Sequence, residues 1–143
     1  MRFMILRKAD RETEAGVMPG TELLAAMQQY MEEMEQAGVL RGGEGLHPSS
    51  KGARVKFHGG KPAVLDGPFA ETKELIAGYS IIEVASLKEA IEWARRWPSM
   101  DAHGELELEV RRVFAAEEFG AEFTPELREA EAQMRERIAK KEP

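Results

Sequence analysis

The sequence predicts an α+β domain with the element order of the ferredoxin-like fold, βαββαβ, with an inserted hairpin and a C-terminal helix. Segments with two-residue and 3.6-residue apolar periodicity alternate along residues 1–113. Two predicted strands are apolar on both faces and a third is charged on one face, as central and edge strands of one sheet would be. We therefore predict one domain over residues 1–113 and a C-terminal extension over residues 114–143.

The first half of this domain is predicted to hold a strand, a helix and a second strand. Residues 2–9 are predicted as a strand because of the apolar run that follows Arg2. Residues 39–46 are predicted as a strand, although three glycines weaken it. Between them, residues 21–37 are predicted as a helix that Gly38 ends, since four apolar residues recur there at helical spacing, namely Leu23, Met27, Tyr30 and Met34.

The inserted hairpin follows, and then the third strand of the core. Residues 53–58 and 61–66 flank Gly59-Gly60, a pair typical of a tight hairpin turn. The third core strand is predicted over residues 78–85, which are largely apolar.

A second helix and a last strand complete the domain. Ser86 and Glu89 form a capping box, so a helix is predicted to begin there and to run to about Trp97, before Pro98. Residues 105–113 alternate strictly between apolar and acidic residues, which predicts an edge strand with one charged face.

The C-terminal extension is predicted to hold a helix over residues 124–140. Thr124-Pro125 is a good helix start, and a thin apolar stripe runs along a charged helix, through Leu127, Ala130, Met134 and Ile138. The helix either packs on its own subunit, which we favour, or forms an arm that reaches across a dimer.

Composition narrows the class of protein. With 143 residues, 43% hydrophobic and 32% charged, the chain resembles ordinary globular proteins and is long enough for one core. The net charge of −6 without a basic stripe argues against a nucleic-acid partner. No apolar run is long enough for a membrane span, and no signal-peptide pattern precedes the domain. Cysteine is absent, so we expect a cytoplasmic protein without disulfides.

The sheet is expected to need a partner. Helices can cover only one of its faces, yet both central strands carry apolar residues on both faces. We expect Met4, Leu6, Ile82 and Val84 to lack cover within one chain and to pack against a second copy. The predicted assembly is a homodimer joined through sheet faces.

One segment also carries a family resemblance. Residues 66–79, DGPFAETKELIAGY, resemble the signature of the DGPF group within the YCII-related family, and shorter likenesses extend over most of residues 1–113. Two departures are Leu65, where Thr is usual, and Tyr79-Ser80, where two aromatic residues are common. The resemblance implies a dimeric α+β barrel, in which two ferredoxin-like sheets pack face to face. The family is mostly of unassigned function.

The candidate catalytic residues are His47 and Asp66. His47 is expected at a strand end, and Asp66 ends the hairpin, so the carboxylate could orient the imidazole as a general base. The resemblance also implies such a His–Asp pair. Alternatively, His47 caps a loop and Asp66 only forms its turn. We expect His47, Asp66 and Tyr79 to share one cleft between the sheet and the hairpin.

The candidate substrate-binding residues are Tyr79, Glu71 and Lys73. Tyr79 could donate a hydrogen bond, and Lys73 could neutralise an enolate, with Glu71 at the rim of the cleft. The alternative for Glu71 and Lys73 is a solvated charged loop.

No metal or cofactor is expected. The three histidines, His47, His58 and His103, lack the spacing of a helical zinc motif and have no thiolate beside them. The glycines of residues 42–45 are too few and wrongly placed for a phosphate loop.

Two function classes remain open. By likeness to isomerases and dehydrochlorinases of this fold, the protein would be a small enzyme that acts on a carbonyl or lactone-like molecule. The alternative is a non-catalytic ligand-binding or regulatory dimer, since the DGPF group is often associated with sigma-factor signalling.

Overall fold

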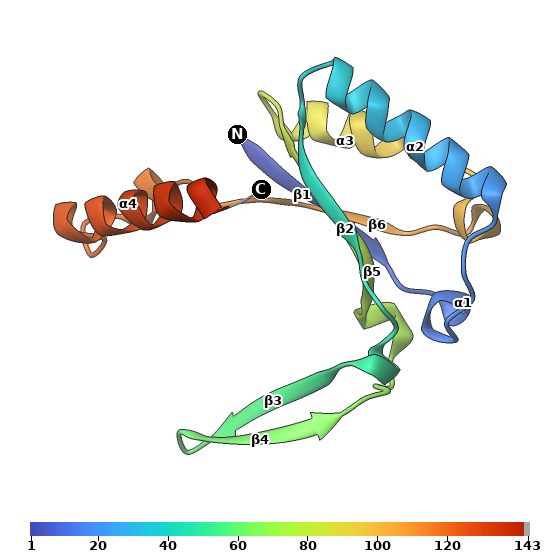
Figure 1. Ribbon diagram of the computed structural model, residues 1–143, viewed down its shortest axis with the longest axis horizontal. Helices are drawn as coiled ribbons and strands as arrows, with labels where there is room; N and C mark the ends of the chain where they lie inside the picture. The colour runs from blue at the N-terminus through green and yellow to red at the C-terminus, as the bar shows by residue number, and fades with distance from the viewer. Residues whose placement is uncertain (142–143) are drawn as a thin grey trace. The chain divides into compact units, whose positions relative to one another are not determined.

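The computed structural model describes residues 1–141 (Figure 1). The chain falls into two compact units, Met1–Arg112 and Val113–Pro143. Six strands lie in the first unit: β1 (Arg2–Lys8), β2 (Leu40–Gly45), β3 (Ala53–His58), β4 (Lys61–Asp66), β5 (Ile76–Glu83) and β6 (Leu108–Arg112). Its α-helices are α1 (Arg11–Glu14), α2 (Thr21–Gln36) and α3 (Leu87–Arg95). No helix of residues 1–141 is long and apolar enough to cross a membrane.

The four-stranded sheet has the order β2-β5-β1-β6, and every neighbouring pair is antiparallel. With α2 after β1 and α3 after β5, this order is that of the ferredoxin-like fold. The predicted fold class is therefore confirmed, including the central positions of the first and third core strands. The dimeric barrel stays a prediction.

One face of this sheet, the helix face, packs against α2 and α3. Its central residues are Phe3 and Ile5 of β1 and Ile82 of β5, which are completely buried or nearly so. Tyr30 and Met34 of α2 and Ala90 and Ala94 of α3 complete this core. Strand alternation sends the neighbouring residues to the opposite, outer face.

The outer face differs in part from the prediction. Met4, Leu6, Tyr79 and Ile81 are partly exposed and share a face by cross-strand pairing, in which Leu6 lies opposite Tyr79 and Met4 opposite Ile81. The expectation that Ile82 and Val84 lack cover is wrong, since both are buried in the helix-side core. The prediction assigned these two residues to the wrong face of the sheet. In a strand that is apolar on both faces, the sequence does not show which alternate residues face the helices.

A partly buried hydrogen bond joins α2 to α3. The Tyr30 hydroxyl donates to the carbonyl oxygen of Trp93 at 2.7 Å, and burial raises the pKa of Tyr30 to about 12. The predicted cap of α3 is present, since Ser86 Oγ accepts from the amide of Glu89 at 3.2 Å. The last strand is shorter than predicted and begins at Leu108, because Asp101–Gly104 forms a 3₁₀ turn.

The hairpin β3–β4 is a separate two-stranded sheet. It turns at Gly59 and Gly60, whose φ angles of 56° and 78° lie in the left-handed region that glycine adopts readily. Val55 pairs with Val64, and the residues of both strands are exposed.

The second unit holds a 3₁₀ turn, Ala116–Phe119, and the helix α4, Pro125–Lys141. Phe119 contacts the rings of Phe114 and Phe123, with centroid distances of 5.0 and 5.6 Å. Thr124 Oγ1 accepts a hydrogen bond from the amide of Leu127 at 3.3 Å, as expected of a helix cap.

Candidate functional site

The helix face of the sheet is hollow where β2 and β5 lack large side chains. Gly43 pairs with Ser80, and Gly45 pairs with Gly78, so two neighbouring rows carry little beyond backbone. A Cβ at Gly43 would lie 2.8 Å from the Tyr79 carbonyl oxygen, whereas one at Gly45 would meet nothing within 4 Å. Glycine at position 43 thus permits close strand pairing, and Gly45 leaves open space.

This hollow is a cleft of about 1040 Å³ between the glycine floor and α2. Its walls are largely apolar and are formed by Val17, Leu24, Met27, Met31, Leu46 and Met100. A cleft of this size with apolar walls and a few polar groups is typical of a small-molecule site. We call it the α2 cleft.

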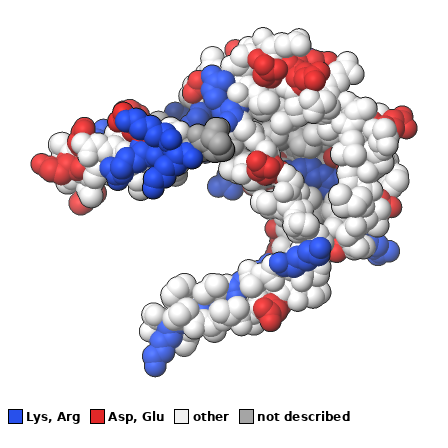
Figure 2. Space-filling model, in the orientation of Figure 1, with Lys and Arg blue, Asp and Glu red and all other residues white. Residues whose placement is uncertain are grey.

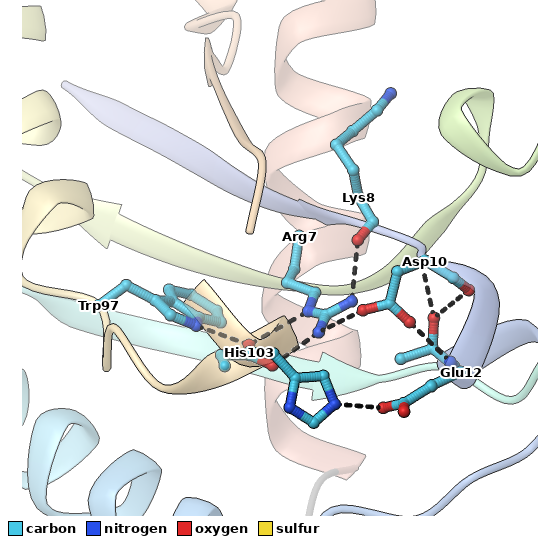
Figure 3. Close-up of polar contacts among 8 residues, drawn as sticks. Arg7, Lys8, Asp10, Glu12, Trp97 and His103 are labelled. Carbon is cyan, nitrogen blue, oxygen red and sulfur yellow. Dashed lines mark hydrogen bonds and ion pairs between the residues drawn. The ribbon is translucent and has the colours of Figure 1, made fainter. Parts of the chain in front are cut away.

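A buried arginine lines the α2 cleft. Arg7 lies on the helix face of β1 beside Gly78, and only 7% of it is exposed. Its Nη2 donates to Asp101 at 2.6 Å and to Asp10 at 3.2 Å, and its Nε donates to Asp101 at 3.2 Å (Figure 3). Trp97 Nε1 adds a bond to Asp101 at 2.9 Å.

These contacts change the acidity of both carboxyl groups. Burial by itself would raise the pKa of Asp101, but the hydrogen bonds from Arg7 and Trp97 and the guanidinium charge outweigh it, so the pKa is lowered. The pKa of Asp10 is also lowered, because the Thr13 amide and Arg7 outweigh its burial. Both carboxylates are therefore charged at neutral pH.

Three acidic residues in and just before the short helix α1 contact three segments that border the α2 cleft. Asp10 caps α1 and binds Arg7. Glu12 Oε2 lies 3.0 Å from Nε2 of His103. Glu14 accepts a hydrogen bond from the amide of Ser49 at 3.0 Å. One turn of helix thus joins β1, the 101–104 turn and the loop after β2.

The predicted residues His47 and Tyr79 both border the α2 cleft. His47 follows the end of β2, after Leu46, whose amide donates to the Ala77 carbonyl oxygen at 2.8 Å. Tyr79 lies between Gly78 and Ser80, and strand alternation directs its ring to the outer face with Leu6.

The other three predicted residues are not among those that line the α2 cleft. Asp66 is exposed at the end of β4, and residues 1–141 show no hydrogen bond between it and His47. Lys73 borders a smaller hollow of about 560 Å³ beside Lys8 and Glu105. Glu71 caps the 3₁₀ turn Thr72–Glu74 with a left-handed φ of 58°.

The Asp66-Gly67-Pro68-Phe69 segment instead contacts the loop after His47 through its backbone. The Gly67 amide donates to the Gly52 carbonyl oxygen at 3.0 Å, and the Phe69 amide donates to Ser49 Oγ at 3.1 Å. A Cβ at Gly67 would lie 1.7 Å from the Ser49 carbonyl oxygen, so no side chain fits there. The motif therefore helps to position the loop that carries His47.

The sequence pattern does not predict the cluster formed by Arg7, Asp10, Glu12, Asp101 and His103. One signal was present: Arg7 interrupts an apolar strand on the face that also carries Phe3 and Ile5, and a buried charge there needs a partner. Its main partner, Asp101, lies 94 residues further along the chain, so spacing alone could not identify it.

Comparisons with known proteins show one family match and one relative. The YCII-related domain matches residues 1–116. An uncharacterised protein of Rhizobium meliloti (strain 1021) is 40% identical over 74 residues, which are 52% of this chain and 56% of that protein. The chain thus spans about half the length of this relative.

One solved structure that the chain matches is 5-chloro-2-hydroxyhydroquinone dehydrochlorinase (TftG) from Burkholderia phenoliruptrix AC1100, in complex with 2,5-dihydroxybenzoquinone. It is 19% identical, with a TM-score of 0.44, and the match covers 80% of this chain and 94% of that chain.

Proposed function

Since this chain belongs to the YCII-related domain family, we propose that its residues 1–113 form a small enzyme that binds a carbonyl or lactone-like molecule and moves protons on it. The site is the α2 cleft. The observation that carries the proposal is the position of His47 at the border of a largely apolar cleft. Imidazole is the side chain that best takes up and returns protons near neutral pH.

The shape and polarity of the α2 cleft suit such a substrate. Apolar walls would hold a hydrocarbon ring or chain and exclude much of the water around it. Ser80 lies on the floor in the row next to Gly78, and its hydroxyl would donate a hydrogen bond to a substrate oxygen.

The chemistry needs no external oxidant or reductant. An imidazole removes a proton from the carbon next to the carbonyl group, and the electron pair of the C–H bond moves toward the carbonyl oxygen to give an enolate. The proton then returns to the same carbon or to another carbon of the conjugated system. The predicted pairing of His47 with Asp66 stays a prediction.

Hydrogen–deuterium exchange tests this function with simple carbonyl compounds in place of the natural substrate. The protein is incubated in D₂O with α-angelica lactone, γ-butyrolactone or cyclopentanone, and loss of the α-proton signal is followed by NMR. We expect faster exchange of at least one compound with the wild-type protein. Gly45→Val should abolish the acceleration, because valine suits a strand and would fill the open space at the cleft floor.

His58→Asn is the matched control, because His58 lies at the exposed hairpin end and does not line the α2 cleft. It should exchange the compound at the wild-type rate. If a compound binds in the cleft and none is exchanged, the protein is a non-catalytic binding module. Equal exchange by Gly45→Val and the wild type would place the chemistry elsewhere.

A further inference from the structure

His103 and Glu12 form a second candidate acid–base pair at the border of the α2 cleft. Nε2 of His103 and Oε2 of Glu12 are 3.0 Å apart, and both residues border the cleft. Their side chains remain 79% and 55% exposed, so a ligand can reach them. A charged carboxylate can only accept, so Nε2 carries the shared proton and the neutral ring keeps its lone pair on Nδ1. Within residues 1–141, nothing hydrogen-bonds to Nδ1.

Arg7 holds the two segments that carry this pair. It binds Asp10, two residues before Glu12, and Asp101, two residues before His103 (Figure 3). Asp101 is buried, with 6% exposed, and is also held by Trp97. A single guanidinium therefore fixes the spacing of two segments that are far apart in the sequence.

The turn that carries His103 has an unusual backbone. Ala102 and His103 have φ angles of 53° and 54°, in the left-handed region that residues other than glycine seldom adopt. Such conformations persist where the surrounding structure imposes them, and they cluster at functional sites. Here the anchored Asp101 directly precedes them.

We propose that His103 is the general base of the α2 cleft, that Glu12 orients its ring, and that Arg7 positions both. This inference rests on the proposed function and assigns its roles: His103 removes a proton, and His47 returns one. Two imidazoles on one cleft allow a proton to leave one carbon and enter another, so the substrate class is an unsaturated lactone or ketone whose double bond can migrate.

The proposed isomerisation consists of two proton transfers and needs no oxidant or reductant. Nδ1 of neutral His103 takes a proton from the carbon between the carbonyl group and the double bond, and the C–H electron pair forms an enolate conjugated with that double bond. Protonated His47 then gives its proton to the far carbon of the system. The product is the conjugated isomer, and exchange with water restores both imidazoles.

α-Angelica lactone is the probe, because its double bond can move into conjugation with the carbonyl group. In D₂O, NMR follows deuterium at the carbon next to the carbonyl, and ultraviolet absorbance follows the conjugated isomer. His103→Asn is chosen because asparagine tolerates left-handed φ. We expect it to lose exchange by about 100-fold or more. His47→Asn should lose formation of the isomer, since the far carbon then has no proton donor.

Glu12→Gln tests whether Glu12 orients the His103 ring. The measurement is the tautomer of that ring, which would not change if Glu12 only stabilised the fold. The ¹⁵N shifts of the His103 ring should report the Nε2–H tautomer in the wild type, and Glu12→Gln should remove this preference. His58→Asn is the control for rate, and circular dichroism checks that each variant is folded.

The outcomes separate the two proposals. If the wild type accelerates exchange and His103→Asn does so equally, the role of His103 is refuted and the proposed function stands. If the wild type accelerates no exchange or isomerisation, both proposals fall. An Nδ1–H tautomer in the wild type would by itself overturn the assignment of Nδ1 as the base.

Discussion

At the scale of single residues, the site depends on one arginine within the sheet. Arg7 occupies a helix-face position of β1, where burial costs free energy unless the charge is paired and hydrogen-bonded. Asp101, Asp10 and the Lys8 carbonyl oxygen supply these partners. The same bonds bring α1 and the 101–104 turn to the α2 cleft, so the group that stabilises the domain also shapes the site.

Asp101→Asn should lower the free energy of unfolding at neutral pH by roughly 3 kcal/mol, since it leaves a buried guanidinium with less compensation. The pKa of Asp101 is lowered on folding from its usual 3.8. The unfolded chain then binds more protons in acid, so this stabilisation is present above about pH 4 and is lost as pH falls through the folded-state pKa.

Urea unfolding from about pH 7 to about pH 3 measures both effects. The variant should lose part of the acid dependence, because Asp10 still contributes. Glu92→Gln is the control: Glu92 pairs with Arg95 on the exposed surface of α3, at 3.8 Å, and should change stability by less than about 1 kcal/mol. Parallel pH curves for the wild type and Asp101→Asn would contradict this role.

At the scale of elements, the α2 cleft exists because a strand pair with only glycine and serine at its floor faces a helix with long side chains. The floor consists of Gly43, Gly45, Gly78 and Ser80, whereas α2 presents Leu24, Met27 and Met31. Flexible methionine side chains can adapt to ligands of different shape. The second half of α2 packs tightly, since Tyr30 and Met34 are buried.

The sequence predicted the elements well because their signals are local. The hairpin strands and the cap of α3 follow from glycine pairs and a capping box, which act over a few residues. The last strand was predicted too long, because its alternation continues into residues that lead out of the 101–104 turn. Local periodicity cannot show where tertiary contacts end a strand.

The candidate site was less predictable because its residues meet through the fold. Only His47 and Tyr79 of the predicted set border the α2 cleft, and the ring of Tyr79 belongs to the outer face. The cleft itself exists because glycines form its floor. In the sequence, these glycines only weaken the predicted strand and do not indicate a cavity. The contact of Glu12 with His103 spans 91 residues.

At the scale of the whole molecule, two surfaces of the first unit favour a second copy of the chain. The outer face of the sheet carries Met4, Leu6 and Ile81. The hairpin exposes Val55, Phe57 and Val64 on one side. Lysine and arginine side chains also lie along the hairpin (Figure 2). Because an isolated two-stranded hairpin is only marginally stable in water, packing against a second copy would stabilise it.

We expect a homodimer in sedimentation at micromolar concentration. Ile81→Glu should give a monomer, because a charge in the centre of an outer-face contact would be buried without a partner. A chain of residues 1–113 should remain dimeric, in keeping with α4 packing on its own subunit. A well-folded monomer of the full chain would contradict the dimer, and a monomer of the shortened chain alone would make residues 114–143 part of the interface.

The most direct test of the central claim asks which face of the sheet binds the small molecule. Methionine methyl groups labelled with ¹³C report on both faces of the sheet. Met4 lies on the outer face. Four other methionines border the α2 cleft, namely Met18, Met27, Met31 and Met100. Titration with α-angelica lactone should shift these four signals and leave that of Met4 unchanged. A shift of Met4 alone would contradict the α2 cleft as the site.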